Sequence, residues 1–140
     1  MSEVSFSKAA EELAKTRGVG ELAEKMGIEL VELSAERAVA TMPVLGNTQP
    51  RGLLHGGAYL VLGETLGSFA ANVWAGPDKY AVGIEISASH SKSATEGQVT
   101  GVATAISLGK TLAIHEVVIS NEQGERCSTV RITNLIRSKK

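Results

Sequence analysis

A long apolar segment in the middle of the chain, Leu53–Gly76 (LLHGGAYLVLGETLGSFAANVWAG), constrains the fold more than any other feature. Between Arg51 and Asp78 it carries a single formal charge, Glu64. The length of the segment and the spacing of its apolar residues, close to 3.6, predict a helix from about Gly57 to Ala75. Such a helix is the element around which the remaining segments must be arranged.

The sides of this predicted helix differ in chemistry. One side is formed by Gly57, Val61, Glu64, Ser68 and Asn72, a second by Leu62, Leu66, Phe69 and Val73, and a thin third one by Gly63, Gly67, Ala70 and Ala71. A helix that is apolar nearly all round is normally buried, and its thin side lets a sheet or a partner chain come close. A lone carboxylate there is costly to desolvate. We therefore expect Glu64 to be either functional or a core carboxylate satisfied by Ser68 or backbone amides.

Composition excludes several classes of protein. The apolar segment is long enough to span a membrane, but its Glu, Asn, His and glycines argue against a transmembrane helix, and no membrane partner is expected. A net charge of −1 and 4% aromatic residues give no case for nucleic-acid binding. The N-terminus has no signal-peptide pattern, and Cys127, the single cysteine, cannot form an internal disulfide or, by itself, a metal site. A cytoplasmic location is expected.

The rest of the chain reads as one domain over residues 1–140, with an N-terminal helical segment over 1–26. Within that segment Ser7–Thr16 is predicted as a helix with Ser7 as its N-cap, and Glu21–Met26 as a further turn. Alternating patterns predict six strands, of which the first two form a hairpin and the last four an antiparallel meander. They are Ile28–Leu33, Arg37–Val44, Tyr80–His90, Gln98–Leu108, Thr111–Ser120 and Glu125–Arg137. A sheet of about six strands wrapped around one helix gives an α+β fold.

Candidate chemistry gathers at the start of the long helix. The glycines after His55 leave backbone amides uncovered by side chains, at a helix end that favours negative charge. These amides suit an oxyanion hole, in which one donor contributes about 3–4 kcal/mol in known enzymes. Glu64 projects from the same face as Gly57, about 10 Å further along the helix axis. That gap is wide for one chain, and a second copy that supplies the carboxylate would close it.

Other catalytic patterns are missing from the sequence. There is no G-x-S-x-G nucleophile elbow, no H-E-x-x-H or C-x-x-C metal spacing and no phosphate-binding loop. His55, His90 and His115 are scattered along the chain, so no metal site or cofactor is expected. We expect His115 to be a core or interface residue, Cys127 a packed small residue, and His55 a functional one.

Three segments carry a family resemblance: QPRGLLHGGAYLVLGETLGS, VGIEISASHSKSATEG and NEQGERCSTVRI. The HGGA motif, followed by Glu and then Ser at this spacing and by a histidine-containing strand, resembles the hotdog-fold acyl-CoA thioesterases over about Ala38–Ile136. Within that family the chain is most similar to the aryl-CoA branch. This branch includes the 4-hydroxybenzoyl-CoA, 1,4-dihydroxy-2-naphthoyl-CoA and phenylacetate-degradation-type thioesterases and the proofreading thioesterase of enterobactin synthesis.

The resemblance implies a hotdog fold and hydrolysis of an aromatic or medium-chain acyl-CoA to free acid and CoA. By position it makes Glu64 the nucleophile or the general base, and the Gly56 amide the group that polarises the thioester carbonyl. His55 and Gln49 lie beside that amide in the family, and Ser68 supports Glu64 or the attacking water. The implied contacts with CoA are His90, Ser91, Lys92, Gly109 and Lys110.

The resemblance also implies that two subunits share each active site. Glu64 and Ser68 come from one subunit of a homodimer and the remaining catalytic residues from the other, and such dimers commonly pair into a homotetramer. No metal or cofactor is implied. Three alternatives remain open: a thioesterase that acts on acyl groups bound to an acyl carrier protein, a hotdog dehydratase, and a non-catalytic acyl-CoA-binding module.

Overall fold

The computed structural model describes the backbone of residues 5–139 and the side chains of residues 7–13 and 18–139. Its long helix begins one residue earlier than predicted and ends where predicted. In chain order the elements are β1 (Ser5–Phe6), α1 (Lys8–Arg17), α2 (Glu21–Met26), β2 (Glu29–Leu33), β3 (Arg37–Pro43), α3 (Gly56–Ala75), β4 (Lys79–His90), β5 (Gln98–Leu108), β6 (Leu112–Ser120) and β7 (Arg126–Ser138).

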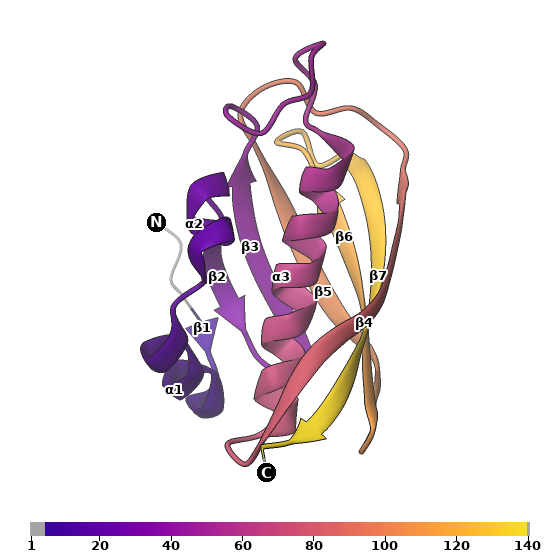
Figure 1. Ribbon diagram of the computed structural model, residues 1–140. Helices are drawn as coiled ribbons and strands as arrows, with labels where there is room; N and C mark the ends of the chain where they lie inside the picture. The colour runs from indigo at the N-terminus through magenta and orange to yellow at the C-terminus, as the bar shows by residue number, and fades with distance from the viewer. Residues whose placement is uncertain (1–4, 140) are drawn as a thin grey trace.

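The strands of the described chain form one sheet in the order β1-β2-β3-β5-β6-β7-β4. Six of them pair antiparallel, and the two-residue β1 runs parallel to β2. The sheet curves around α3, while α1 and α2 lie beside the β1–β3 end (Figure 1). The prediction of an α+β fold, with an antiparallel sheet wrapped around one central helix, is therefore confirmed.

The predicted meander of the last four strands is wrong in one connection. The β5, β6 and β7 strands pair in sequence, but β4 pairs with β7, where Ala88 lies opposite Val130, and β5 pairs with β3. An alternating pattern identifies a strand but not its neighbour, and consecutive strands need not pair. As a result β4 is an outermost strand of the sheet, on the side away from α1.

The glycine side of α3 packs directly on β7. A Cβ atom added to Gly63 would lie 2.6 Å from a Val130 methyl carbon, and one added to Gly67 would lie 2.3 Å from an Ile132 methyl carbon. Both distances are shorter than real carbon contacts, so the helix reaches this depth because these residues are glycine. The adjacent face buries Leu62 and Leu66 completely. The thin side expected from the sequence therefore faces the sheet.

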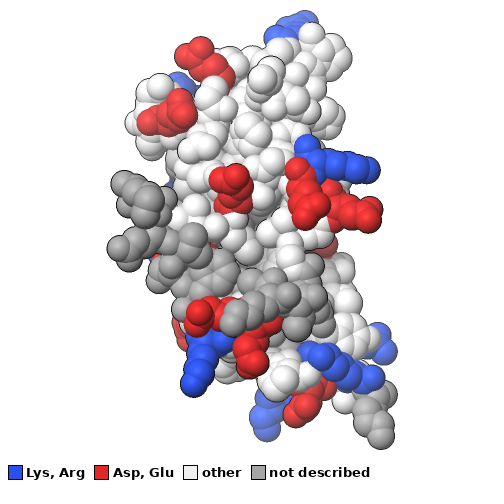
Figure 2. Space-filling model, turned by 90° about the vertical axis from the view of Figure 1, so that its left-hand side faces the viewer, with Lys and Arg blue, Asp and Glu red and all other residues white. Residues whose placement is uncertain are grey.

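The helical segment before β2 is placed by a cap. The Ser7 hydroxyl oxygen accepts a hydrogen bond from the Ala10 N–H at 3.2 Å, which confirms Ser7 as the N-cap of α1. This helix contacts both β1 and α3. On the face that carries α1 and α2, acidic and basic side chains are interspersed (Figure 2). Within residues 5–139 no helix is both long and apolar enough to cross a membrane.

Candidate active site

His55 caps the long helix. Its backbone is extended, with φ −62° and ψ 135°, and its Nδ1 accepts a hydrogen bond from the Gly57 N–H at 2.8 Å. An accepting Nδ1 carries no proton, so the neutral ring carries its proton on Nε2. His55 is exposed, and its own N–H donates to the Asn47 carbonyl at 2.9 Å. The cap thus fixes the ring beside the first amides of the helix.

The Gly56 amide is available to a ligand. Gly56 is the first residue of α3, and its N–H has no acceptor among the residues that the structure describes. The N-terminal end of a helix carries partial positive charge, which favours a developing oxyanion. The His90 ring lies against this backbone, since a Cβ on Gly56 would be 3.1 Å from His90 Nε2. A side chain at position 56 would therefore press on the His90 ring.

A cavity of about 340 Å³ opens beside this amide. Several of the predicted residues meet here, and the lining comprises Gln49, Leu53, Leu54, Gly56, Tyr59, His90, Ser91, Lys92 and Ser93. His90 Nδ1 lies 2.9 Å from the Ser128 hydroxyl, which donates to the Ser89 carbonyl. The bond to Ser128 holds the His90 ring with its Nε2 toward Gly56.

The other predicted groups in this cavity are held by neighbours in the same chain. Ser91 Oγ donates to the Arg126 carbonyl at 3.3 Å, and Lys92 Nζ lies 3.4 Å from Glu125 Oε2. The Gln49 side-chain oxygen accepts from the Arg51 amide. The Lys92 ion pair is exposed and stabilises little, so the ammonium is free to exchange partners.

Glu64 is exposed, and the expectation of a buried carboxylate is wrong for this chain. The outermost strand β4 leaves the polar side of α3 open, so the carboxylate needs no buried partner. Its Oε2 lies 2.8 Å from the position that a Cβ on Gly83 would occupy. Glu64 and Gly83 line a cavity of about 250 Å³ together with Ile84, Glu85, Ile86 and Ile132. The core-carboxylate interpretation is thereby excluded.

One turn further along α3, the Ser68 hydroxyl donates to Asn134 Oδ1 at 3.3 Å. Asn134 is fully buried on β7 and pairs in register with Gly83 of β4. Sequence reasoning did not single out Gly83 or Asn134. Two signals point to them: a glycine inside a strand, and an Asn at an inward position of an otherwise apolar alternation.

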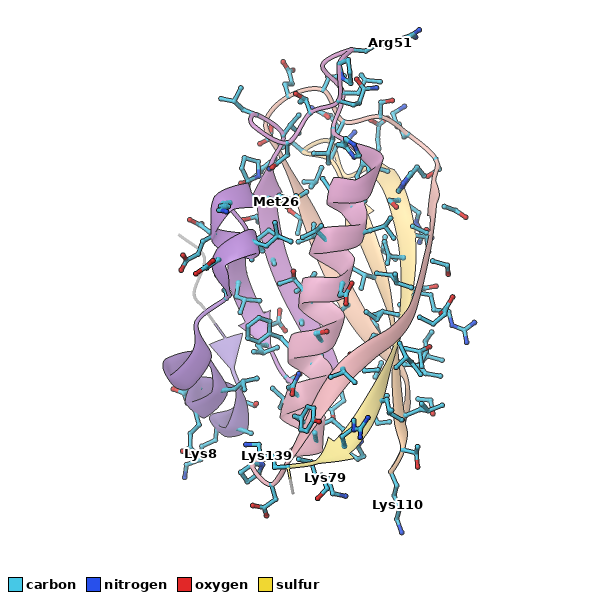
Figure 3. All side chains as sticks on the ribbon, in the orientation of Figure 1. Lys8, Met26, Arg51, Lys79, Lys110 and Lys139 are labelled. Carbon is cyan, nitrogen blue, oxygen red and sulfur yellow. The ribbon has the colours of Figure 1, made fainter. Side chains whose placement is uncertain are left out.

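Gly109 and Lys110 lie at the opposite end of α3. They form the turn between β5 and β6, where Gly109 N–H donates to Leu112 O and Trp74 Nε1–H donates to Gly109 O, at 2.9 and 2.8 Å. Figure 3 shows Lys110 and Arg51 at opposite ends of the molecule. The Gly56 cavity and the Glu64 cavity share no lining residue. Within one chain, therefore, the predicted site residues lie in separate places.

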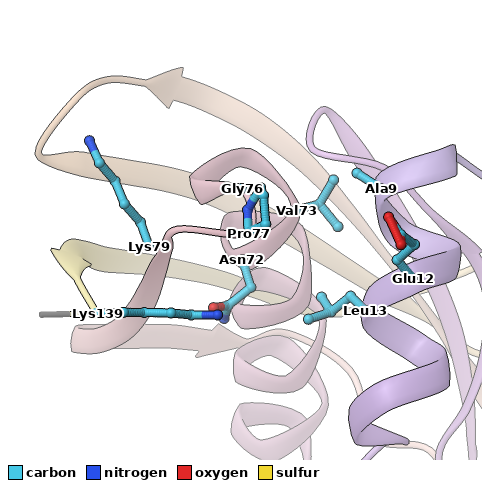
Figure 4. A pocket seen from close by; sticks show the side chains of 9 residues that line it. All are labelled: Ala9, Glu12, Leu13, Asn72, Val73, Gly76, Pro77, Lys79 and Lys139. Atoms are coloured by element: carbon cyan, nitrogen blue, oxygen red, sulfur yellow. The ribbon is translucent and has the colours of Figure 1, made fainter.

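A further cavity of about 250 Å³ lies between α1 and α3 and reaches Ser68. Its lining is Leu13, Gly18, Val19, Gly20, Ser68, Phe69 and Asn72. Leu13 and Asn72 also line a neighbouring cavity of about 280 Å³ at the end of α3, near Lys79 and Lys139 (Figure 4). Apolar side chains thus lie next to Ser68 on the α1 side of the helix.

His115 and Cys127 are core residues, as predicted. Both are fully buried, and His115 Nε2 lies 2.8 Å from the Ala35 carbonyl. Burial lowers the pKa of His115, which keeps the ring neutral with its proton on Nε2. Across residues 5–139, His, Cys, Asp and Glu side chains form no group of three or more that could hold a metal ion.

The sequence matches one family model. The model of the Thioesterase superfamily aligns with residues 51–128, the span that contains the helix cap, Glu64, Ser68 and His90. The chain therefore belongs to the Thioesterase superfamily, and its fold and relatives make it a thioester hydrolase of the hotdog type.

Proteins with similar sequences or structures include thioesterases and a CoA-thioester hydrolase. The proofreading thioesterase EntH of Cronobacter turicensis is 44% identical over 126 residues, covering 89% of this chain and 92% of that protein. The 1,4-dihydroxy-2-naphthoyl-CoA hydrolase of Escherichia coli is 37% identical, with coverages of 89% and 93%. Among solved structures, a thioesterase of Haemophilus influenzae superposes with a TM-score of 0.84 at 32% identity, covering 92% of this chain and 90% of that one.

Proposed function

We propose that this chain hydrolyses an aromatic or medium-chain acyl-CoA to the free acid and CoA. Glu64 acts as general base on a water, or attacks as the nucleophile, while the Gly56 N–H stabilises the oxyanion that forms on the thioester carbonyl oxygen. The CoA thiolate leaves with the electron pair of the C–S bond. Two features of α3 carry the proposal: the Gly56 amide at its start has no acceptor among the described residues, and the same helix presents the exposed Glu64 carboxylate.

The proposal includes a homodimer formed through β4. This strand is 12 residues long, and within the described chain its outer edge has no strand beside it. Val82 and Ile84 on it are 37% and 54% exposed. A long, exposed and apolar strand edge is a template for pairing, which natural proteins otherwise keep short or covered. A second copy of β4 is the matching partner for a two-fold interface.

Antiparallel pairing of two β4 strands would also bring together the Gly56 cavity and the Glu64 cavity, which lie apart in one chain. It reverses the second chain, so that the His90 end of one β4 approaches the Lys79 end of the other. The amide cavity of one subunit then approaches the Glu64 cavity of its partner. In the same way Gly109 and Lys110 of one subunit approach His90, Ser91 and Lys92 of the other, where we place the CoA contacts. We extend the proposal to a homotetramer of such dimers.

The cavity beside Ser68 supports the acyl part of the proposal. Leu13, Val19 and Phe69 give it an apolar lining next to a proposed catalytic hydroxyl. Apolar walls with few polar groups are what an aromatic or medium-chain acyl group requires. The cavity lies between α1 and α3, and the Asn72 side chain in its lining accepts a hydrogen bond from the Ala81 N–H of β4 at 2.9 Å.

A second candidate donor is an acyl group carried by a carrier protein. It is favoured by the 44% identity to a protein described as a proofreading thioesterase. Both donors present a thioester at the end of a pantetheine arm, so the same residues would act on either. A dehydratase or a non-catalytic module is less consistent with Glu64 and Ser68 at thioesterase spacing.

We also infer a cytoplasmic location, because the single cysteine is a buried free thiol.

The experiment is thiol release, followed with a disulfide reagent, across benzoyl, hydroxybenzoyl, dihydroxynaphthoyl, phenylacetyl, short and long acyl-CoA esters. Glu64→Gln is the control, and because Glu64 is exposed the variant is expected to fold normally. We expect turnover that prefers aryl or medium chains and falls by about 10²-fold or more in the control. Flat, low rates on every CoA ester, with turnover of the carrier-bound ester, would move the assignment to the carrier-protein donor. Near-wild-type rates for Glu64→Gln would contradict the proposed mechanism.

A further inference from the structure

Asn134 is a buried amide whose presence packing does not explain. It is fully buried on the inner face of β7, where the neighbouring inward residues are Ile132 and Val130. Burying an amide is unfavourable unless it is hydrogen-bonded. Within the part of the chain that the structure describes, its Nδ2 has no partner. An apolar residue of the same size would fill this position at lower free-energy cost.

The contacts of Asn134 connect it to the proposed catalytic side of α3. Its Oδ1 accepts the Ser68 hydroxyl at 3.3 Å. Its register partner across the sheet is Gly83, the residue against which the Glu64 carboxylate lies. Directly opposed residues in antiparallel strands have Cβ positions about 4.5–5.5 Å apart. Glu64, Ser68 and Asn134 therefore form one local cluster.

We propose that Asn134 is a positioning residue that aims the hydrolytic water by acting through Ser68. The inference rests on the proposed thioesterase function. A hydroxyl has one proton to donate. Because Ser68 donates it to Asn134 Oδ1, Ser68 Oγ presents its lone pairs and serves as an acceptor. A water held between Ser68 Oγ and the Glu64 carboxylate has both protons engaged, and its free lone pair faces the thioester carbonyl carbon.

The reaction balances with Ser68 unchanged. The water oxygen bonds to the carbonyl carbon, Glu64 takes one water proton, and the C–S bond breaks with its electron pair leaving on the CoA sulfur. Ser68 keeps its own proton throughout. Without Asn134 the hydroxyl is free to rotate and to donate to Glu64 instead, since the two residues are one turn apart on α3. That bond would occupy the base and leave the water with one acceptor.

The test is a double-mutant cycle on the full-length protein, with benzoyl-CoA and a medium-chain acyl-CoA as substrates. Asn134→Leu removes both polar ends at similar volume, Ser68→Ala removes the hydroxyl, and Thr133→Val, on the outer face of the same strand, is the matched control. We expect Asn134→Leu and Ser68→Ala each to lower kcat about ten-fold with KM little changed, and the double variant to lose no more than either single one. Thr133→Val keeps wild-type kcat.

Asn134→Thr provides a variant with an oxygen acceptor on the same strand face, and we expect it to regain part of the kcat lost in Asn134→Leu. If the Leu variant does not fold, the same cycle is run with Asn134→Thr and Ser68→Ala, where losses that multiply would overturn the inference. Wild-type kcat in Asn134→Leu, together with an inactive Glu64→Gln, refutes the role of Asn134 alone. Retained activity in Glu64→Gln refutes the proposed function instead.

Discussion

Gly83 offers a direct test of how the Glu64 carboxylate is placed. A Cβ at position 83 would lie 2.8 Å from Glu64 Oε2, and an ordinary contact begins at 3.4 Å. In Gly83→Ala the carboxylate must therefore withdraw by about 0.6 Å. A misplacement of about 1 Å at a reacting group lowers the rate by about 10²-fold, so a withdrawal of this size lowers kcat by roughly ten-fold. The backbone fits alanine because the φ angle of Gly83 is not positive.

The fold itself should tolerate Gly83→Ala, because the obstructing atom is the end of a flexible, exposed side chain. Gly67→Ala is the contrasting variant, since its Cβ would meet Ile132 in the core at 2.3 Å. Such overpacking costs about 1–3 kcal/mol, which lowers Tm by several degrees in a domain of this size. Steady-state kinetics and thermal unfolding on both variants separate the effects. Wild-type kcat in Gly83→Ala would show that Glu64 is not held over Gly83 during turnover.

Three further predictions concern the helix cap and the core. Gly56→Pro removes the amide proton at the first helical position, where proline is well tolerated. It should lower kcat about 10²–10³-fold relative to Gly56→Ala, which adds a Cβ but keeps the N–H. Equal kcat in the two variants would exclude the amide as an oxyanion donor. His55→Ala should lower stability by about 1 kcal/mol in thermal unfolding, and His55→Asn, which keeps a cap, should not; equal losses would exclude capping. Burial lowers the pKa of His115, so as the pH falls the unfolded chain takes up a proton on this imidazole before the folded chain does. The contribution of His115 to the free energy of unfolding is therefore complete above about pH 6.5 and falls below it by up to about 1.4 kcal/mol per pH unit. Denaturant titrations at several pH values should show a weaker pH dependence of stability in His115→Gln.

Sequence patterns predicted the elements of this fold more reliably than their neighbours. The apolar run from Leu53 to Gly76 predicted α3 nearly to the residue, because its length and period leave little choice. The thin glycine side was predicted correctly, since small side chains in a buried helix mark a close approach. The pairing of β4 with β7 was not, because alternation is a property of one strand and pairing is set by the packing of the whole sheet.

In the site, too, local features were predicted better than relations between segments. The position of His55 at the start of the helix followed from its place before two glycines, and its capping hydrogen bond is present. The burial of Glu64 was mispredicted, because sequence shows that a helix is apolar but not that an outermost strand leaves one side of it open. Gly83 and Asn134 were missed because their meaning depends on register: they face each other across β4 and β7 beneath Glu64 and Ser68. Such a relation is visible only once the strands are paired.

We propose that one active site takes Glu64 from one subunit and the Gly56 amide from another, and subunit mixing distinguishes this arrangement from a site within one chain. Glu64→Gln and Gly56→Pro chains, each inactive alone, are unfolded together at equal amounts, refolded and assayed for acyl-CoA hydrolysis. In a shared two-fold site each mixed dimer carries one intact site, so activity should return to roughly a quarter of the wild-type value under random pairing. Continued inactivity of the mixture, with mixed dimers present, would show that both groups act within one chain and would rule out a site shared between subunits.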